Sequence, residues 1–126
     1  MNLDIIVTKK RDYVYAVSLK GSIDGATYEE LEGELKEIID SKAKAAILDM
    51  SDVSYISSIG IRVIMSTKKA LTAIGASFTM VNLQPQIKKV FDVMKILPMF
   101  DIFNDMPEAD KYIDQMIKEE MEKQSV

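Results

Sequence analysis

The sequence contains no cysteine and no histidine. Without cysteine there are no disulfides and no thiolate ligands for a metal ion. Without histidine the chain lacks the commonest general base and the commonest metal ligand, so Ser-His-Asp and Cys-His catalysis cannot be assembled from it. Chemistry that uses carboxylates alone, and binding of Mg²⁺, remain open.

Positive charge and long apolar runs are also scarce. The formal net charge is −4 at pH 7, and the basic residues are interleaved with acidic ones, which argues against a nucleic-acid-binding surface. No apolar run approaches the roughly 20 residues of a membrane helix. The first residues lack the charged-then-apolar layout of a signal peptide. We therefore expect a cytoplasmic protein with no nucleic-acid partner and no membrane insertion.

What the chain does have is the composition of a folded domain. Its 126 residues are 48% hydrophobic, which suffices for one buried core. We find no repeat, low-complexity tract or flexible linker. The sequence therefore predicts a single domain over residues 1–126, with a solvated C-terminal tail that frays from about residue 118.

The hydrophobic pattern switches several times between the period of a strand and that of a helix. The predicted order is β-β-α-β-α-β-α-β-α, an α/β fold with a mixed, mainly parallel sheet of about five strands and four helices. The predicted strands cover residues 3–8, 13–19, 45–50, 77–83 and 100–103; the predicted helices cover 27–41, 58–74, 85–97 and the chain from 107 onward.

Local signals place the ends of these elements. Residues 9–12, 21–26 and 51–57 are predicted to be turns or polar connections. Thr27 and Glu30 have the spacing of a capping box, Gly75 is a helix stop, and Pro98 blocks a helix from continuing. The methionines are predicted to fill the core rather than to form an adaptable binding surface; those in question are Met94, Met99 and Met106.

Functional residues of an open α/β sheet gather where its strands end. Small, polar and hydroxyl-bearing residues lie at four such places, 21–24, 49–52, 57–60 and 82–84. Asp24 and Asp49 would make only a weak Mg²⁺ site without a phosphate ligand. We interpret Asp49 as structural and leave Asp24 open between a turn residue and a functional one.

The segment Ser57-Ser58-Ile59-Gly60 has two interpretations. One serine caps the following helix, a contribution of about 1 kcal/mol. Alternatively, the second serine is an exposed hydroxyl at a helix N-terminus that accepts a phosphate, which the helix dipole tolerates and a docked partner does not. Both hold together if Ser57 caps and Ser58 accepts. Gly60 would then let the backbone of a partner approach closely.

Residues 45–74 resemble the signature of STAS domains, a family named for sulfate transporters and anti-sigma factor antagonists. The corresponding run is Leu48-Asp49-Met50-Ser51, then Val53 and Tyr55, then Ser57-Ser58-Ile59-Gly60-Ile61 opening an apolar helix. Gly21-Ser22-Ile23-Asp24 with Thr27, and the strand–proline–helix–strand ending at 81–103, also resemble the family. The match covers nearly the whole chain and implies the STAS fold.

The resemblance to the antagonist branch implies a binding switch and not an enzyme. The unphosphorylated protein would bind a serine-kinase anti-sigma factor and release the sigma factor. Phosphorylation at Ser58, or alternatively at Ser57, would end the binding, and a serine phosphatase would reset it. No cofactor is implied, and we expect a monomer or weak dimer. The implied partner-binding residues are Ser22, Asp24, Ser57, Ser58, Ile59, Gly60 and Arg62.

Two positions depart from the family pattern. Ser57 stands where the family often has Asp, so it brings no charge and becomes a competing acceptor. Arg62 stands where a small residue is common. It either pairs with a phosphate or is an exposed surface residue of the helix without a functional role. The altered Ser57 keeps a second hypothesis open, an adaptor STAS domain without phosphorylation in a signalling or transporter assembly. A third, a small phosphate or nucleotide enzyme using Asp24 and Asp49, is disfavoured because no glycine-rich phosphate loop is present.

Overall fold

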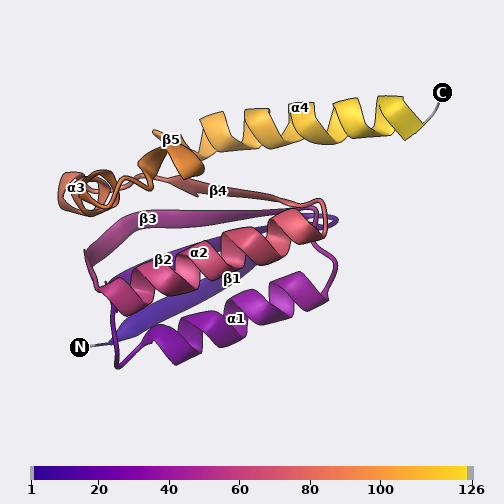
Figure 1. The fold of residues 1–126 in the computed structure, drawn as a ribbon. Helices are drawn as coiled ribbons and strands as arrows, with labels where there is room; N and C mark the ends of the chain where they lie inside the picture. Colours follow the sequence, from indigo (N-terminus) through magenta and orange to yellow (C-terminus); the bar gives the residue numbers. More distant parts are fainter. Residues whose placement is uncertain (1, 125–126) are drawn as a thin grey trace.

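The computed structural model describes residues 2–124 and contains one mixed five-stranded sheet, in the order β1-β2-β3-β4-β5 (Figure 1). The first two strands pair antiparallel and the others parallel. The strands are β1 (Leu3–Arg11), β2 (Val14–Ile23), β3 (Ala45–Ile56), β4 (Ser77–Val81) and β5 (Asp101–Phe103). The helices are α1 (Tyr28–Asp40), α2 (Ser58–Ala73), α3 (Pro85–Val93) and α4 (Met106–Gln124), with a 3₁₀ turn η1 (Leu97–Met99). The predicted element order and fold class are confirmed.

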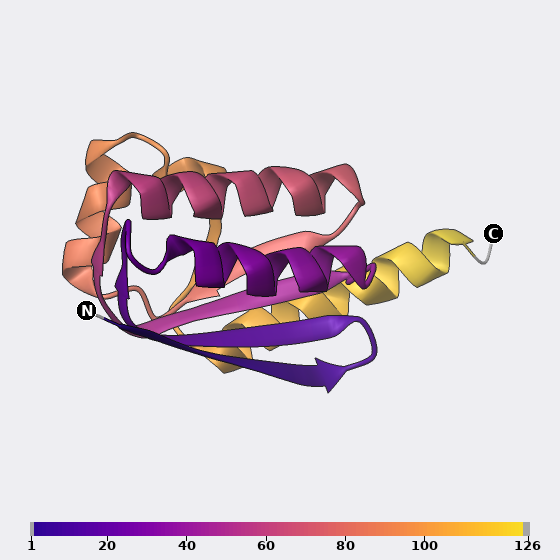
Figure 2. The same ribbon diagram turned by 90° about the horizontal axis from the view of Figure 1, so that it is seen from below.

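Helices cover both faces of the sheet. Helices α1 and α2 lie on one face, and α4 lies on the other (Figures 1 and 2). Strand β3 is buried on both sides: Ala46 and Leu48 belong to the core under α1 and α2, whereas Ala45 and Ile47 belong to the smaller core under α4. Since successive side chains of a strand point to opposite faces, this double burial explains the uninterrupted apolar run of β3.

Strands β1, β2 and β3 are longer than predicted, whereas β4 ends at Val81, two residues before its predicted end, and β5 begins at Asp101, one residue after its predicted start. Strand β1 continues to Arg11, and β2 continues through Gly21 to Ile23. Strand β3 continues to Ile56, so the polar connection predicted at 51–57 is wrong. Its pairing with β2 shifts register twice in this stretch, and such irregularities bend a strand and tolerate glycine. Gly21 has a φ of 124°, and a Cβ there would lie 2.1 Å from the Asn2 carbonyl oxygen.

The capping box predicted at Thr27 is also absent. Thr27 precedes α1, but its hydroxyl makes no cap hydrogen bond to the helix. It accepts from the Asp24 N–H at 3.0 Å and donates to the Ser22 carbonyl at 2.7 Å. Because Thr27 is buried, these two bonds make it the closing residue of the β2–α1 turn rather than a helix cap.

The other helix ends follow the predictions in part. Gly75, with a φ of 75°, comes directly after Ile74, the C-cap of α2, as expected for a helix stop. Pro85 occupies the first turn of α3. That helix ends at Val93, before Pro98, because Lys95 adopts the left-handed conformation at φ 60°. Helix α4 continues to Gln124, through most of the tail for which fraying is predicted.

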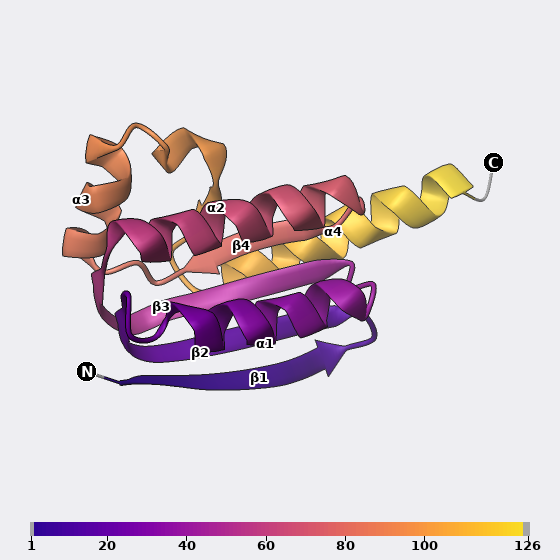
Figure 3. The ribbon, with the colours of Figure 1, turned by 60° about the horizontal axis from the view of Figure 1, so that its bottom comes forward.

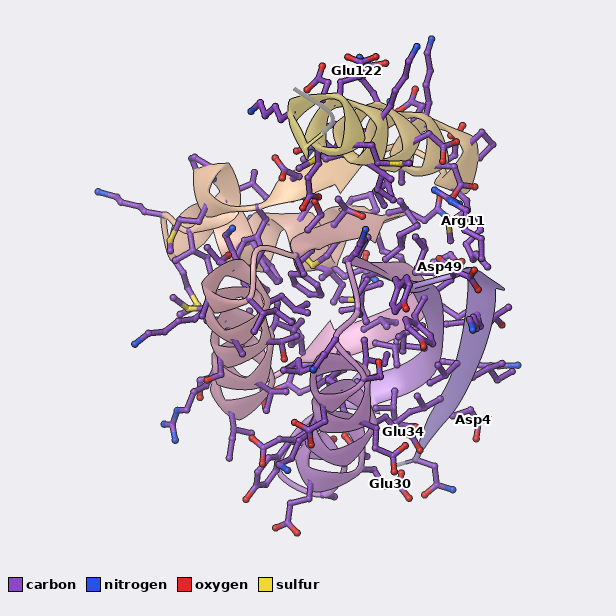
Figure 4. The ribbon with its side chains drawn as sticks, turned by 90° about the vertical axis from the view of Figure 1, so that its right-hand side faces the viewer. Asp4, Arg11, Glu30, Glu34, Asp49 and Glu122 are labelled. Carbon is purple, nitrogen blue, oxygen red and sulfur yellow. The ribbon has the colours of Figure 1, made fainter. Side chains whose placement is uncertain are left out.

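Ion pairs join α4 to the end of β1. Lys10 Nζ lies 2.5 Å from Asp110 Oδ2, and Arg11 Nη2 lies 2.5 Å from Asp114 Oδ1. Figure 4 shows Arg11 at this end of the sheet, on the side of α4. Among the described residues, none of the helices is long and apolar enough to cross a bilayer.

A shallow acidic hollow lies at the outer edge of the sheet. Asp4 of β1 and two residues of α1, Glu30 and Glu34, line it together (Figure 4). Like charges at positions i and i+4 of a helix destabilise it slightly. The hollow is therefore a place where one charge substitution should raise the stability of the fold.

Candidate functional site

The site is built where β2 and β3 end and α2 begins. Figure 1 shows the end of β3 bending toward the start of α2. The backbone N–H of Ser57 donates to the Ile23 carbonyl at 2.9 Å, which ties the start of α2 to the end of β2. Since Asp24 follows Ile23 directly, the turn that holds Asp24 adjoins the first turn of α2.

Ser57 is the N-cap of α2. Its Oγ accepts a hydrogen bond from the Gly60 N–H at 3.3 Å, and its backbone is extended. The Ser57 carbonyl accepts from the Ile61 N–H at 2.9 Å, the first bond of the helix. Ser57 thus satisfies one of the N–H groups that a helix start leaves without a partner, and its hydroxyl is engaged and half-buried.

Gly60 is buried beneath this turn. A Cβ at Gly60 would lie 2.8 Å from Ile23 Cγ2, from the Ile23 carbonyl oxygen and from Ile56 Cγ1. The glycine is therefore required for the close approach of α2 to the ends of β2 and β3. The expectation that Gly60 lets a partner approach is corrected, because the space around it is already filled from within.

Ser58 is exposed and is the first residue of α2. No acidic residue occupies the first turn of this helix, so the partial positive charge of its N-terminus has no carboxylate of the helix beside it. Arg62 is exposed and follows Ser58 by four positions, which places both side chains on one face of the helix. A phosphate on the exposed Ser58 hydroxyl would therefore lie at the positive end of the helix dipole and on the same face as the Arg62 guanidinium.

The Asp24 turn lies beside this surface. Asp24 Oδ1 accepts from the Ala26 N–H at 2.9 Å and lies 3.3 Å from the Thr27 hydroxyl oxygen, and Asp24 is half-buried. Ser22 is only 2% exposed. The expectation that Ser22 contacts a partner directly is therefore corrected: it lies under the turn, where its carbonyl accepts the Thr27 hydroxyl.

Arg62 also affects the start of α1. The pKa of Tyr28 is raised above its ordinary value because Glu29 hydrogen-bonds to it and adds negative charge, and the positive charge of Arg62 opposes that rise. Helix α2, which carries Arg62, packs beside α1 (Figure 3). Arg62 thus contributes positive charge to the same side of the molecule as Ser58 and the start of α1.

A second polar group lies elsewhere. Asp49 Oδ1 accepts from the Asn82 amide at 3.3 Å, and the Gln84 amide donates to the Ser51 carbonyl at 2.7 Å. Asp49 pairs with Ser18 of β2 and Ile56 pairs with Ile23, five residues further along β2, a distance of about 17 Å along a strand. The polar strand ends predicted to share one edge therefore form two groups, because β4 stops at the level of Asp49 while β2 and β3 continue.

The described residues offer no metal site. Within residues 2–124, no three His, Cys, Asp or Glu side chains group closely enough to hold a metal ion. Asp49 instead accepts from the Ser51 N–H at 3.0 Å, consistent with its interpretation as a structural residue.

A groove beside Ser58 was not predicted. It has a volume of about 670 Å³ and is lined by α2 and by side chains from residues 94–100. Met94 and Met99 are 46% and 49% exposed, which corrects the prediction that they fill the core. The two walls come from segments about 30 residues apart in the sequence, so no local pattern predicts the groove.

A profile of the STAS domain family matches residues 6–109, which include the whole of the site described above. The chain belongs to the STAS domain family. It is 30% identical over 95 residues to BtrV of Bordetella bronchiseptica, named as a putative anti-sigma factor antagonist; the match covers 75% of this chain and 82% of that protein.

Solved structures show the same STAS fold. An anti-sigma factor antagonist from Mycobacterium paratuberculosis superposes with a TM-score of 0.80 at 21% identity, covering 89% of this chain and 94% of that one. The Bacillus cell fate determinant SpoIIAA in its phosphorylated form superposes with a TM-score of 0.71 at 18% identity, covering 90% and 99%. The family assigned from the motifs at 45–74 is thereby confirmed.

Proposed function

We propose that this STAS protein is an anti-sigma factor antagonist that binds a serine-kinase anti-sigma factor and loses that binding when Ser58 is phosphorylated. The observation that supports the proposal most strongly is that two adjacent serines have different roles at the start of α2. Ser57 accepts the Gly60 N–H as helix cap, whereas Ser58 is exposed at the first position of α2. The relatives that are anti-sigma factor antagonists support the partner class.

The docking surface in this proposal is the exposed part of the β2–α1 turn and the first turns of α2. Its members are Asp24, Ser57, Ser58, Ile59 and Arg62, while Ser22 and Gly60 hold the two segments in place from beneath. In the phosphorylation step, the kinase transfers the γ-phosphoryl group of ATP to Ser58 Oγ. ADP leaves, and the hydroxyl proton passes to a base on the kinase. A serine phosphatase hydrolyses the ester and restores the hydroxyl, so the antagonist is a substrate throughout.

The switch works by charge and desolvation. A phosphoserine adds nearly two negative charges and three acceptor oxygens. The start of α2 accommodates them through its dipole and free N–H groups, but a partner surface packed over Ser58 would have to bury them. A differential of about 3 kcal/mol between the two forms would change occupancy by more than a hundredfold.

Ser57 is the competing acceptor, and the structure favours Ser58 over it. Phosphorylation of Ser57 would require the kinase to reach a hydroxyl that is half-buried and already accepts the Gly60 N–H. Ser58 has no such role in the helix start, so its modification leaves the fold intact.

The test is phosphorylation by the cognate serine kinase with ATP, followed by intact mass measurement. We expect one phosphate on the native chain and on Ser57→Ala, and none on Ser58→Ala. A chain that stays unmodified, under conditions that modify a control antagonist, would contradict the switch and favour the adaptor function. The replacement of the family's usual Asp by Ser57 is the observation that keeps that alternative in view.

A further inference from the structure

The groove beside Ser58 runs along one stripe of α2. The α2 residues that line it recur at spacings of three and four, from Ser58 through Met65 to Thr72. This is the spacing at which one helix presents a seam to another. Fourteen residues of helix rise about 21 Å, so the α2 side of the groove spans about that length. A compact small molecule would cover only part of it, whereas a helix of about four turns would follow it throughout.

The floor of the groove is apolar and adaptable. Ile61, Met65 and Phe100 line it from below, and Met94 and Met99 form the opposite wall. Met94 and Met99 are exposed, Met65 is half-buried, and Ile61 and Phe100 are buried; exposed apolar side chains that gather in one place are typical of an interaction surface. Methionine side chains are flexible and polarisable, which suits them to contacts with an incoming helix. In Figure 3, the segment that follows α3 lies beside the N-terminal half of α2.

The rim of the groove is cationic. Arg62, Lys68 and Lys69 line it, and no Asp or Glu is among the lining residues. Within residues 2–124, none of the three forms an ion pair with a carboxylate, whereas Lys10, Arg11 and Lys36 do. Positive charge is thus concentrated and uncompensated along this groove, although the chain as a whole carries a net charge of −4.

We infer that the groove receives an acidic amphipathic helix of the protein partner. The apolar face of that helix packs on the methionines, and its flanking carboxylates pair with Arg62, Lys68 and Lys69. The inference rests on the proposed function for the identity of the partner, but not for the chemistry of the groove. It also gives Arg62 a part in the switch, because a phosphate on Ser58, four residues earlier, competes with the partner's carboxylates for the same guanidinium.

The experiment uses the full chain labelled with ¹³C in its methionine methyl groups. The probe is a 16-residue peptide held helical by side-chain lactam bridges, with leucine along one face and glutamate on both flanks. A second peptide has lysine in place of every glutamate. We expect the acidic peptide to shift the methyl signals of Met65, Met94 and Met99, and to leave those of Met116 and Met121 on α4 unchanged. The lysine peptide should bind at least tenfold more weakly.

Paired charge reversals supply the matched control. The double variant Lys68→Glu and Lys69→Glu should bind the acidic peptide at least tenfold more weakly than the native chain does. Lys88→Glu with Lys89→Glu, an exposed pair on α3 that does not line the groove, should change its affinity less than twofold. Unchanged signals of Met116 and Met121 on α4, together with an unchanged circular dichroism spectrum, confirm that both pairs leave the fold intact.

Three results would overturn the inference: no shift of the groove methionines at millimolar acidic peptide, equal binding of the acidic and basic peptides, or the same methyl shifts on raising the protein concentration alone, which would make a second copy the occupant. Each is independent of phosphorylation. Failure here leaves the switch at Ser58 standing, and failure of the switch leaves the groove's preference for an acidic helix measurable.

Discussion

Replacing Ser58 with aspartate should stabilise the fold while it imitates the charge of the phosphorylated state. The residue is exposed and opens α2, whose first turn carries no carboxylate. A negative charge there gains about 0.3–1 kcal/mol from the helix dipole, and a pair with Arg62 at i+4 adds about 0.2–0.5 kcal/mol. For a chain of this length, the combined gain raises the unfolding temperature by about 2–6 °C.

The assay is thermal and urea unfolding of Ser58→Asp beside Ser58→Asn, which has a similar shape without the charge. Because the folded state lowers the pKa of the new carboxyl, the gain is present above its unfolded value of about 3.9 and is lost as the pH falls through the folded value. The gain should also shrink in 1 M salt, where the Debye length is about 3 Å. Combining each variant with Arg62→Gln removes the ion pair, so the stabilisation that remains is the contribution of the helix dipole. Destabilisation of Ser58→Asp by more than 1 kcal/mol would refute this placement of Ser58.

Three further substitutions test the supports of the site and the edge of the sheet. Gly60→Ala should destabilise the fold by about 1–2 kcal/mol in urea unfolding, because overpacking against β2 and β3 outweighs the better helix propensity of alanine; a stabilised variant would show that α2 can move away. Thr27→Val should cost about 1–3 kcal/mol, because the buried groups of the β2–α1 turn lose its hydroxyl, and an unchanged unfolding midpoint would contradict this. Glu34→Lys should add about 0.3–1 kcal/mol at low salt by pairing with Glu30 at i−4; a loss of stability at low salt would disprove the repulsion.

The order of elements could be predicted from the sequence because each helix carries its own local signals. The start of α2 is the clearest case, since Ser57 caps it and the apolar period of 3.6 begins directly afterwards. Pro85 marks the start of α3 in the same way, because a first helical turn needs no N–H from it. These signals act over a few residues and need no knowledge of the rest of the fold.

The lengths of the strands could not be predicted in the same way. Residues 51–55 of β3 are all exposed except Val53, and Ser51, Asp52 and Ser54 are residues typical of a loop. They are held in the sheet by pairing with β2, a partner about 30 residues earlier. The consequence for the site is direct, because the extra length of β3 separates Ser58 from Asp49.

The burial of residues within the site could not be predicted from the sequence either. Ser22 and Gly60 carry the composition of an exposed turn, yet both lie beneath the surface because three segments converge on them. The groove depends on tertiary packing in the same way. Met94 and Met99 become exposed because α3 ends at Val93 and Lys95 turns the chain in the left-handed conformation.

The most direct measurement is the affinity of the cognate serine-kinase anti-sigma factor for two preparations of the native chain, one unmodified and one carrying a single phosphate on Ser58. Isothermal titration calorimetry should show a dissociation constant at least a hundredfold larger for the phosphorylated chain, with both preparations equally folded by circular dichroism. Equal affinity of the two preparations would contradict the claim that the hydroxyl at the start of α2 governs docking.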